Sequence, residues 1–463
     1  MASEKRSYDV AIVGGGASGT ALLYVLSKYT NIGRIALLEK YPEFGAVNSN
    51  AKNNSQTLHV GEIETNYTIE KVRQVYPASM MVRRYTDSLP AGARRRIIKR
   101  VQKMVLAVGD KESATLEKRY AALREVFPSL RKIEASGIRK AEPEIMRGRN
   151  PKEKVLALFN AEGYAVDFSR LAKSFASEVK KRWRGRAEIL LNCEVRAILR
   201  GTNGYTLRTN AGTVSARIVV VDADAYSLGF AKALGYGKEF SLIPIAGNFY
   251  FTPERLRGKV YRVQDPRMPF AAVHGDPDLT RPSVTRWGPT ARFYPALEAR
   301  NLNTIAPFFA SSGLHRIQTW ISFARILLDP VRFWYLFRNL LYEIPIVGTC
   351  LFLSQVRKIV PTLRASDIRR ASGYGGMRLQ RVNTKTRELL LGEGKIVGDN
   401  IIFNMSPSPG ASVCLYNAMR DAEQIGIFSG NYAFDKKRML ADLSISQVRA
   451  PSADTSLNES YAS

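Results

Sequence analysis

The sequence predicts an α/β protein whose N-terminal segment folds as a strand, a tight turn and a helix. Residues 8–13 are mostly apolar, as in a buried parallel strand, and residues 21–26 repeat apolar side chains at helical spacing. The turn between them is Gly14, Gly15, Gly16, Ala17, Ser18 and Gly19. Gly14 permits the turn, Gly16 lets the backbone approach a pyrophosphate, and Gly19 lets the helix lie against the strand. The N–H groups of the first helical turn, at Ala17 and Ser18, would face the anion.

A second strand is predicted over residues 34–38, and it ends at Glu39. An acidic residue at this position accepts the ribose hydroxyls of an adenosine and disfavours a 2′-phosphate. A glycine-rich turn can arise by chance, but here both strands, the helix and the acid occur in the expected order. We therefore predict a Rossmann-type dinucleotide-binding domain. This half-site does not distinguish NAD from FAD.

The composition is that of a globular protein with several domains. The 463 residues are 45% hydrophobic and 24% charged, which is ordinary usage and excludes a collagenous or wholly disordered chain. At about 150 residues per domain, the chain divides into roughly three domain-sized pieces. Its cysteines, Cys193, Cys350 and Cys414, are far apart in sequence. We therefore expect a reducing compartment, with no disulfide framework and no metal site.

The chain carries a large excess of positive charge. Lys and Arg number 69 against 41 Asp and Glu, for a formal net charge of +28, and such a field attracts phosphate-rich surfaces such as anionic lipid or nucleic acid. The N-terminus runs directly into the first strand and shows no signal peptide. The best candidate for a membrane span, residues 340–353, is too short and contains Glu343 and Pro345. Any membrane contact is therefore expected to be peripheral, without a transmembrane helix.

Residues 53–67 form a long and unusual polar segment, NNSQTLHVGEIETNY. It resembles the FAD-dependent malate:quinone oxidoreductases, within a larger group that includes L-2-hydroxyglutarate dehydrogenase, glycerol-3-phosphate dehydrogenase and the D-amino-acid oxidases. The resemblance implies FAD as the cofactor. In that group the corresponding loop reaches the flavin ring, which implies flavin or pyrophosphate contacts at Asn54, Ser55, Gln56 and Thr57. It also implies that His59 lies near the reacting face.

Three later stretches extend the resemblance, which covers residues 8–426. Residues 272–291 resemble the family's strand pair over the flavin, and residues 403–412 its closing flavin loop. Residues 371–378 resemble the place where related oxidases present an arginine to the substrate carboxylate. Further cofactor contacts are expected at Val195, Ser408, Gly410 and Ala411. One position departs from the family pattern, because related flavoproteins carry glycine or a small residue where Asp224 stands.

Oxidation of a 2-hydroxy acid requires a base for the hydroxyl proton, a hydride acceptor, and cations for the carboxylates. His59 and His274 lie in family-like segments. We expect the base at His274, with His59 beside the flavin, where it tunes the ring or shares the proton; a purely structural role is the alternative for each. Arginine binds a carboxylate through paired hydrogen bonds, and Arg378 and Arg286 are the candidates to hold the two carboxylates of malate.

We predict a discontinuous FAD-binding domain of Rossmann type and an α+β substrate or cap domain that carries a helical insertion for membrane docking. The FAD-binding domain is expected to comprise residues 1–82, 151–235 and 366–430, with a helix over 168–183. The other expected parts are a helical insertion at 83–150, the substrate-domain sheet at 236–313, an amphipathic helical insertion at 314–365 and a flexible C-terminal tail at 431–463.

The insertion at 314–365 contains two predicted helices. The first carries an apolar stripe at helical spacing, formed by Ile317, Trp320, Ile321, Ala324, Leu327 and Leu328. Asp329 and Pro330 then supply the N-cap and first-turn proline of a second helix, over 331–341, which is apolar almost all round. Such helices fit shallow insertion into an anionic bilayer, or else burial within the cap domain. Because a quinone dissolves in the bilayer, the resemblance favours membrane docking.

The function expected from residues and resemblance together is FAD-dependent oxidation of (S)-malate to oxaloacetate, with electrons passed to a membrane quinone. The expected location is the cytoplasmic face of the plasma membrane, and no specific nucleic acid is expected as a partner. One alternative is oxidation of another 2-hydroxy acid such as L-2-hydroxyglutarate, because one methylene changes binding by only about 1–3 kcal/mol. The other is a non-enzymatic protein that binds lipid or nucleic acid on a Rossmann shell.

Overall fold

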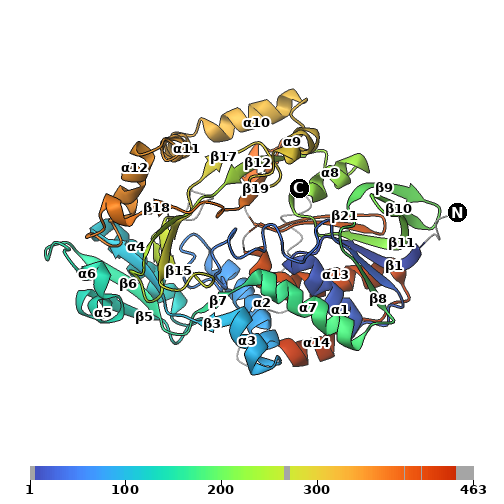
Figure 1. Ribbon diagram of the computed structural model, residues 1–463, viewed down its shortest axis with the longest axis horizontal. Coiled ribbons are helices and arrows are strands. Elements are labelled where there is room, and N and C mark those ends of the chain that lie inside the picture. Colours follow the sequence, from blue (N-terminus) through green and yellow to red (C-terminus); the bar gives the residue numbers. More distant parts are fainter. Residues whose placement is uncertain (1–5, 265–271, 391, 408, 445–463) are drawn as a thin grey trace.

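The computed structural model describes residues 6–264, 272–390, 392–407 and 409–444. These residues form two large sheets, a four-stranded sheet and a two-stranded sheet. In Figure 1 the sheet that contains the N-terminal strand lies at one end of the molecule, and the second large sheet lies at the other end. The predicted α/β fold, with a Rossmann-type unit and a second α+β unit, is confirmed.

The first sheet contains the predicted strand, turn and helix. Its strands are β1 (Arg6–Val13), β2 (Ile35–Leu38), β8 (Ala187–Leu190), β9 (Val195–Gly201), β10 (Gly204–Thr209), β11 (Gly212–Val221), β21 (Gly394–Gly398) and β22 (Ile401–Met405). The strands β22, β11, β1, β2 and β8 are parallel neighbours in that order. Because side chains alternate along a strand, Val10 and Ile12 face one hydrophobic core, and Ala11 and Val13 face another.

Helices cover one face of this sheet. They are α1 (Ala17–Tyr29), α2 (Ile69–Asp87), α7 (Phe168–Arg182), α13 (Cys414–Ser429) and α14 (Lys436–Leu443) (Figure 1). The helix α7 confirms the one predicted over 168–183. The flexible tail predicted over 431–463 is wrong up to residue 444, because Met439 and Leu443 of α14, four residues apart, are buried in the core. Residues 445–463 lie outside the described part of the chain.

The second large sheet has eight strands, in the order β18–β13–β16–β15–β14–β4–β6–β5. Their bounds are β4 (Lys103–Val108), β5 (Arg131–Glu134), β6 (Val155–Asn160), β13 (Tyr250–Pro253), β14 (Lys259–Arg262), β15 (His274–Pro277), β16 (Val284–Gly288) and β18 (Arg369–Arg370). One face packs through Met104, Val260 and Trp287 on the apolar residues of α5 (Ala135–Ala141), α6 (Pro143–Met146) and α12 (Val347–Val356). By strand alternation, the opposite face carries Lys259, Tyr261, His274, Asp276 and Arg286.

The helical insertion predicted over 83–150 is only partly helical. It contains α3 (Ala91–Ile97), α4 (Asp110–Leu123), α5 and α6, but also β3 (Ile98–Arg100), β4 and β5. The strand β3 pairs with β7 (Tyr164–Val166), and β4 lies at the centre of the second sheet, between β14 and β6. A short, continuous apolar run such as that of β4 looks the same in a buried strand and in a buried helix. The prediction of a helical segment is therefore wrong at β4.

A four-stranded sheet joins segments that the sequence placed in different domains. Its order is β17 (Arg292–Phe293), β12 (Phe240–Ala246), β19 (Met377–Asn383) and β20 (Glu388–Leu390). Thus β19, assigned to the FAD-binding domain as part of 366–430, pairs with β12 of the substrate domain, and β20 joins the same sheet through β19. Two helices pack on this sheet near the first sheet, α8 (Ala225–Ala233) and α9 (Ile305–Ser312).

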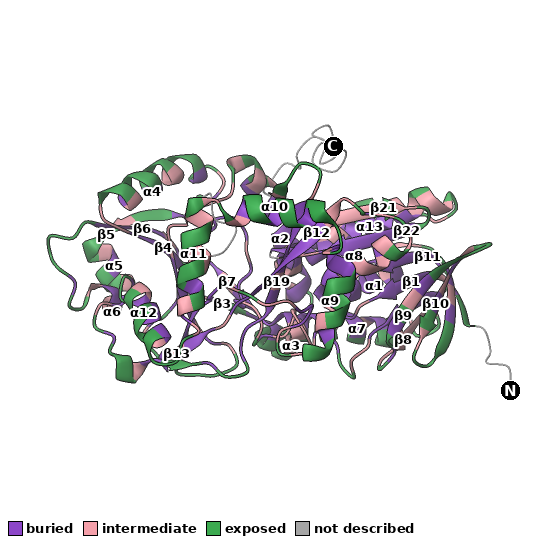
Figure 2. Cartoon of the chain, turned by 90° about the horizontal axis from the view of Figure 1, so that it is seen from above, coloured by how far each residue is buried: buried purple, intermediate pink, exposed green. Residues whose placement is uncertain are grey.

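The two helices predicted in the 314–365 segment are present as α10 (Ile317–Leu327) and α11 (Pro330–Leu341). The Asp329 side chain accepts a hydrogen bond from the Arg332 N–H at 3.0 Å, as expected for an N-cap. The helices α10, α11 and α12 follow one another along one side of the molecule (Figure 1), and much of α10 and α11 is exposed (Figure 2). Within the described ranges, none of the helices combines the length and apolar character needed to cross a bilayer.

Candidate active site

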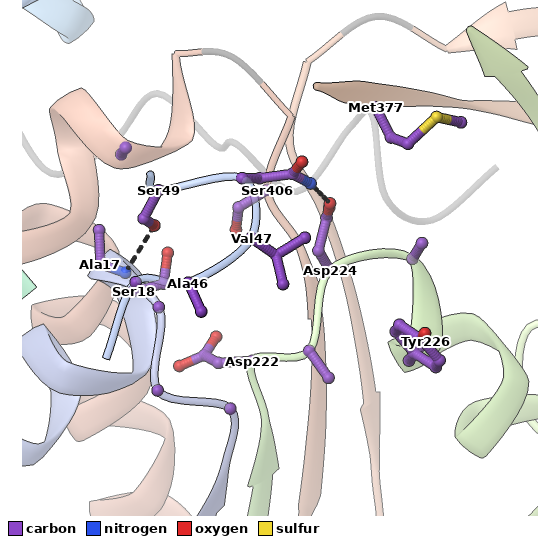
Figure 3. Close-up of a pocket in the computed structure, with 18 of the residues that line it drawn as sticks. Ala17, Ser18, Ala46, Val47, Ser49, Asp222, Asp224, Tyr226, Met377 and Ser406 are labelled. Atoms are coloured by element: carbon purple, nitrogen blue, oxygen red, sulfur yellow. Dashed lines mark hydrogen bonds between the residues drawn. The ribbon is translucent and has the colours of Figure 1, made fainter. Parts of the chain in front are cut away.

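A deep pocket lies where the parallel strands β1, β2 and β11 end, and it extends to β19. The space between its walls, open solvent included, is about 1680 Å³. Its walls are the glycine turn, residues 45–59, the loop that follows β11 and one end of β19 (Figure 3). Ligands of open α/β sheets bind at the carboxyl ends of the strands, as this position allows.

The glycine turn has the geometry that its sequence predicts. Gly14 has a φ of 114°, and a Cβ there would lie 2.4 Å from the carbonyl oxygen of Asp222. A Cβ on Gly19 would lie 2.0 Å from the carbonyl oxygen of Gly14. Glycine is therefore required at both positions, at Gly14 for the turn and at Gly19 for the contact between turn and helix. The predicted residues Gly14, Gly16, Ala17 and Ser18 line the pocket, whereas Gly19 lies behind it.

The start of α1 leaves backbone donors for a ligand. Gly16 is its N-cap and makes no side-chain capping bond. The Ala17 N–H donates to Oγ of Ser49 at 3.0 Å, a contact drawn in Figure 3. An uncapped helix N-terminus in a pocket binds an anion through its free N–H groups and its dipole. The arrangement suits a pyrophosphate.

Glu39 stands at the end of β2 and lines the pocket, as predicted. Its carboxylate accepts hydrogen bonds from the backbone N–H of Gly15 at 2.6 Å and of Tyr41 at 2.8 Å. Burial raises the pKa of Glu39, although these two backbone donors act in the opposite direction. The bonds hold the carboxylate at the mouth of the turn, where a ribose would be expected.

The polar segment identified from the sequence runs along the pocket. Asn54, Ser55, Thr57 and His59 line it, together with Val195 and Ala411. Gln56 does not: it is fully buried, and its side chain donates to the Ala51 carbonyl at 3.0 Å and accepts from the Leu279 N–H at 2.8 Å. Gly410 also lies off the lining, at the start of a 3₁₀ turn over Gly410–Val413. Ser408 lies outside the described residues.

Sequence reasoning missed pocket residues that come from distant segments. The most informative are Ser49, Asp222 and Ser412, which line the same cavity. Asp224, the departure from the family pattern, also lines it and adopts a φ of 49°, in the region that glycine favours. Its carboxylate accepts a hydrogen bond from Nδ2 of Asn48 at 2.7 Å, which anchors it in this conformation. In the sequence, the sign that Asp224 lines the pocket is its position shortly after the end of a strand.

His59 is fixed from several sides. Its Nδ1 faces Oε1 of Glu64 at hydrogen-bond distance, and its Nε2 lies 3.2 Å from Oγ of Ser55. Its backbone N–H donates to Oγ of Ser412 at 3.0 Å. Burial alone would raise the pKa of Glu64, but the adjacent His59 outweighs this effect and the pKa is lowered. Glu64 is therefore an acceptor, so Nδ1 of His59 carries a hydrogen and points to Glu64, while Nε2 is the ring nitrogen on the side of Ser55.

His274, the expected base, is placed differently. It is buried on β15, away from the pocket lining. Its Nε2 lies 3.3 Å from Oδ2 of Asp276, and its ring stacks on Tyr261 with centroids 4.3 Å apart. Burial lowers the pKa of His274, although Asp276 opposes the shift. The strand pair β15–β16 that contains it confirms the pair expected within 272–291.

The two arginine candidates also differ. Arg378 lines the pocket on β19 and is half-buried. Burial lowers its pKa, and within the described ranges no carboxylate forms an ion pair with it. Arg286 lies off the lining and is fully buried, with ion pairs to Asp276 at 3.7 Å and Asp278 at 3.4 Å. The guanidinium of Arg378 is thus open to a ligand, and that of Arg286 is already paired.

Two buried lysines support the polar segment from the second sheet. Nζ of Lys259 donates to the Ser55 carbonyl at 2.9 Å, and Nζ of Lys103 donates to the Leu58 carbonyl at 2.6 Å. Lys103 also pairs with Glu62 at 2.8 Å. These bonds hold the main chain on both sides of Thr57, and hence the approach to His59. The inner face of the second sheet therefore positions one end of the pocket.

Comparison with known proteins agrees with this geometry. The chain matches the family described as FAD dependent oxidoreductase over residues 9–408. It is 39% identical to a malate:quinone oxidoreductase of Helicobacter pylori (strain J99) over 446 residues, which are 94% of this chain and 98% of that protein. It is 39% identical to a probable malate:quinone oxidoreductase of Campylobacter jejuni over 437 residues, 92% and 97% of the two chains.

Solved structures share the fold. An FAD-bound L-α-glycerophosphate oxidase from Mycoplasma pneumoniae has a TM-score of 0.62 at 16% identity, covering 93% of this chain and 97% of its own. Glycine oxidase from Geobacillus kaustophilus has a TM-score of 0.63 at 17% identity, covering 96% and 100%. The uncapped helix, the glycine cradle and the acid at the end of β2 fit FAD. The chain is thus an FAD-dependent oxidoreductase and belongs to the malate:quinone oxidoreductase family.

Proposed function

We propose that this enzyme oxidises (S)-malate to oxaloacetate and passes the electrons to a membrane quinone. The proposal is supported by relatives that carry this name over nearly the whole chain. The observation that carries it is that one cavity is lined by His59, whose Nδ1 is held by Glu64 and whose Nε2 faces Ser55, and by Arg378, which has no carboxylate partner among the described residues. Bound FAD supplies acceptance of a hydride and the return of its electrons to an acceptor.

His59 is proposed as the base, in place of His274. Its Nε2 faces the pocket side of Ser55, and Glu64 stabilises the positive imidazolium that forms when Nε2 takes the hydroxyl proton of the substrate. His274 stays in the buried cluster with Asp276, away from the lining, which favours a structural role. The base is thus supplied by the polar segment itself.

Arg378 is proposed to bind a substrate carboxylate. Its guanidinium is half-buried and has no acidic partner in the described part of the chain, so it gains strongly from a bidentate carboxylate. Arg286 already forms ion pairs with Asp276 and Asp278. It is therefore proposed to hold β16 against β15 and not to contact the substrate. This division leaves the second carboxylate of malate without an assigned residue.

Membrane docking is proposed for the helices α10, α11 and α12. Their exposed apolar side chains, here called the apolar ridge, are Ile317, Trp320, Ile321, Leu328, Phe333, Trp334, Phe337, Leu340, Ile344, Ile346, Val347 and Leu351. On α10, Ile317, Trp320 and Ile321 are exposed, while Phe323 and Ile326 are buried against the protein. The helix thus carries apolar side chains on its exposed side as well as on its buried side, whereas a surface helix usually exposes polar residues. A patch of this size indicates an interaction surface, and the chain's positive charge suits an anionic bilayer.

We place the enzyme at the cytoplasmic face of the membrane. Cys193, Cys350 and Cys414 are free thiols, which suits a reducing compartment. The cytoplasmic leaflet is also the more anionic one, and it attracts a chain with a net charge of +28. The non-enzymatic alternative is not retained, because the chain belongs to an enzyme family.

Anaerobic addition of (S)-malate to the purified protein tests this function. We expect the flavin absorbance to bleach and to return when a soluble quinone analogue is added. L-2-Hydroxyglutarate is the essential comparison, because a dehydrogenase of that substrate from Nematostella vectensis is 26% identical over 450 residues. Faster bleaching by L-2-hydroxyglutarate than by malate would contradict the substrate assignment. Bleaching without reoxidation by any quinone would contradict the acceptor.

A further inference from the structure

Two buried carboxyl groups share one asparagine at the wall of the pocket. Asn404, on β22, donates one Nδ2 hydrogen to Oδ1 of Asp222 at 2.8 Å and the other to Oδ2 of Asp421 at 2.7 Å. Lys395, on β21, pairs with Asp421 at 2.6 Å. Oδ2 of Asp222 is buried, and among the described residues it has no hydrogen-bond partner. Asp222 is thus half-satisfied in a place that water does not reach.

Asp222 lies directly against the glycine turn. It follows the last residue of β11, and its N–H donates to the Val13 carbonyl at 2.8 Å. Its own carbonyl oxygen occupies the space beside Gly14 that a Cβ would need. Figure 3 shows Asp222 and Asp224 on the loop after β11, and both residues line the pocket. A pyrophosphate bound at the glycine turn therefore brings negative charge close to the Asp222 carboxyl group.

The surroundings of Asp222 favour its neutral form. Burial raises the pKa of Asp222 to about 7, and the charge of Asp421 adds to the effect, while Asn404 and Lys395 oppose it. Other ionisable groups lie nearby: Cys414 on α13 faces Asp222, and Glu393 before β21 faces Asp421 and also Lys71 of α2, while Asp224 lies on the same loop as Asp222. Burial raises the pKa of Cys414 to about 12, so its thiol adds no charge.

We propose that FAD binding is coupled to the uptake of one proton from water by the Asp222–Asp421 pair. With one proton the pair keeps a single negative charge, which is paired with Lys395, so one negative charge fewer lies near the pyrophosphate. It also gives the unsatisfied Oδ2 of Asp222 a hydrogen to donate. The inference requires FAD as the cofactor, and it is independent of the substrate and of the electron acceptor. Its failure is therefore distinguishable from failure of the malate and quinone assignments.

The structure offers a matched control in Asp224. This residue is also a buried carboxyl group of the pocket wall, two positions further along the loop. Its carboxylate, however, is hydrogen-bonded by Nδ2 of Asn48 and by the backbone N–H groups of Ser406 and Ala225. Burial raises the pKa of Asp224 too, although these donors oppose the shift. Since the Asp224 carboxylate has these donors, whereas Oδ2 of Asp222 has no partner among the described residues, we expect Asp222 rather than Asp224 to take up the proton. Asp224→Asn and Asp222→Asn therefore separate a general loss of negative charge from the specific coupling.

The test is the pH dependence of the dissociation constant for FAD. Holoprotein is diluted at several values from about pH 6 to about pH 9 at constant ionic strength, and released flavin is measured by fluorescence. For uptake of one proton, linkage predicts that the Kd rises up to about tenfold per pH unit above about pH 7. Calorimetric reconstitution of apoprotein at about pH 8, in two buffers of different ionisation heat, should report close to one proton taken up.

The variants decide which carboxyl group is responsible. Asp222→Asn should bind FAD with a nearly pH-independent Kd and more tightly than the wild type at about pH 9, because the amide carries no charge. Asp224→Asn should keep the wild-type slope. Reconstitution of the wild type without proton uptake would overturn the proposal, and so would an Asp222→Asn variant with an unchanged slope. If Asp222→Asn fails to fold, the wild-type calorimetry still decides.

Discussion

Glu64 holds His59 by its Nδ1 atom and thereby turns Nε2 of the same ring toward Ser55 at the pocket. The second oxygen of Glu64 accepts the Gly61 N–H at 2.9 Å, so the carboxylate is itself fixed. The proposed base and its carboxylate lie five positions apart in the chain, and both belong to the polar segment first noticed in the sequence. The orientation proposed for the base is therefore set within this one loop.

Glu64→Gln tests the partnership. The glutamine carbonyl can still accept from Nδ1, but it lacks the charge that stabilises the imidazolium, so the rate of flavin reduction by malate should fall by about tenfold or more. The acidic limb of the pH–rate profile should move to lower pH. Stopped-flow absorbance of the flavin measures both. Glu43→Gln, at an exposed acid paired with Lys173, is the control; an unchanged profile in Glu64→Gln would exclude this role.

Arg378→Lys should weaken substrate binding. Lysine keeps the charge but loses the paired hydrogen bonds, and a charge-assisted hydrogen bond contributes about 1.5–3 kcal/mol. The KM for malate should therefore rise by about tenfold or more, while the Kd for FAD stays the same. Steady-state kinetics with flavin titration checks both values. A normal KM would remove Arg378 from the substrate site.

Arg286→Lys should act on stability instead. Asp276 and Asp278 are both buried, and a lysine at position 286 would form weaker ion pairs with them than the arginine does. Breaking a buried ion pair destabilises a protein by about 3–5 kcal/mol, and a lysine replacement should lose part of that. Thermal unfolding of the holoprotein measures the change. A raised KM for malate at an unchanged Tm would contradict this assignment and return Arg286 to the substrate site.

The family resemblance singled out the polar segment, most of which lines the pocket, whereas local sequence rules predicted the glycine turn and the acid at the end of β2, because each depends on neighbours within about twenty residues. The same rules could not find Asp222 or Ser412, which reach the pocket only through sheet order and the packing of α13. The preference for His274 over His59 came from motif position. It could not anticipate that strand alternation turns His274 toward Asp276 and Tyr261. Long-range pairing such as β12 with β19 leaves no local pattern.

Trp334→Asp and Phe337→Asp should weaken binding to anionic vesicles. Both side chains are exposed on α11, within the apolar ridge. Burying a large apolar side chain is worth about 1.5–3 kcal/mol, so each loss should lower vesicle binding by about tenfold or more. Sedimentation with vesicles measures it. Reduction of a soluble quinone analogue should be unaffected. Ile427→Asp, at an exposed isoleucine of α13, is the control; equal loss there would argue against docking through the ridge.

Lys103→Met should destabilise the protein by about 3–5 kcal/mol, because it leaves the buried Glu62 carboxylate unpaired. Burial already raises the pKa of Glu62, while Lys103 opposes the shift; without the lysine the rise is larger. The folded-state pKa of this carboxyl group then lies above its unfolded value of about 4.3. Protonation of the group therefore stabilises the folded state fully below about pH 4.3, and this stabilisation is lost as the pH rises toward neutrality. Urea unfolding at several pH values measures this.

The double variant Lys103→Met, Glu62→Leu should recover most of the loss and flatten the pH dependence, because no unpaired charge remains. A double variant as unstable as the single one would show that Lys103 acts through its bond to the Leu58 carbonyl instead.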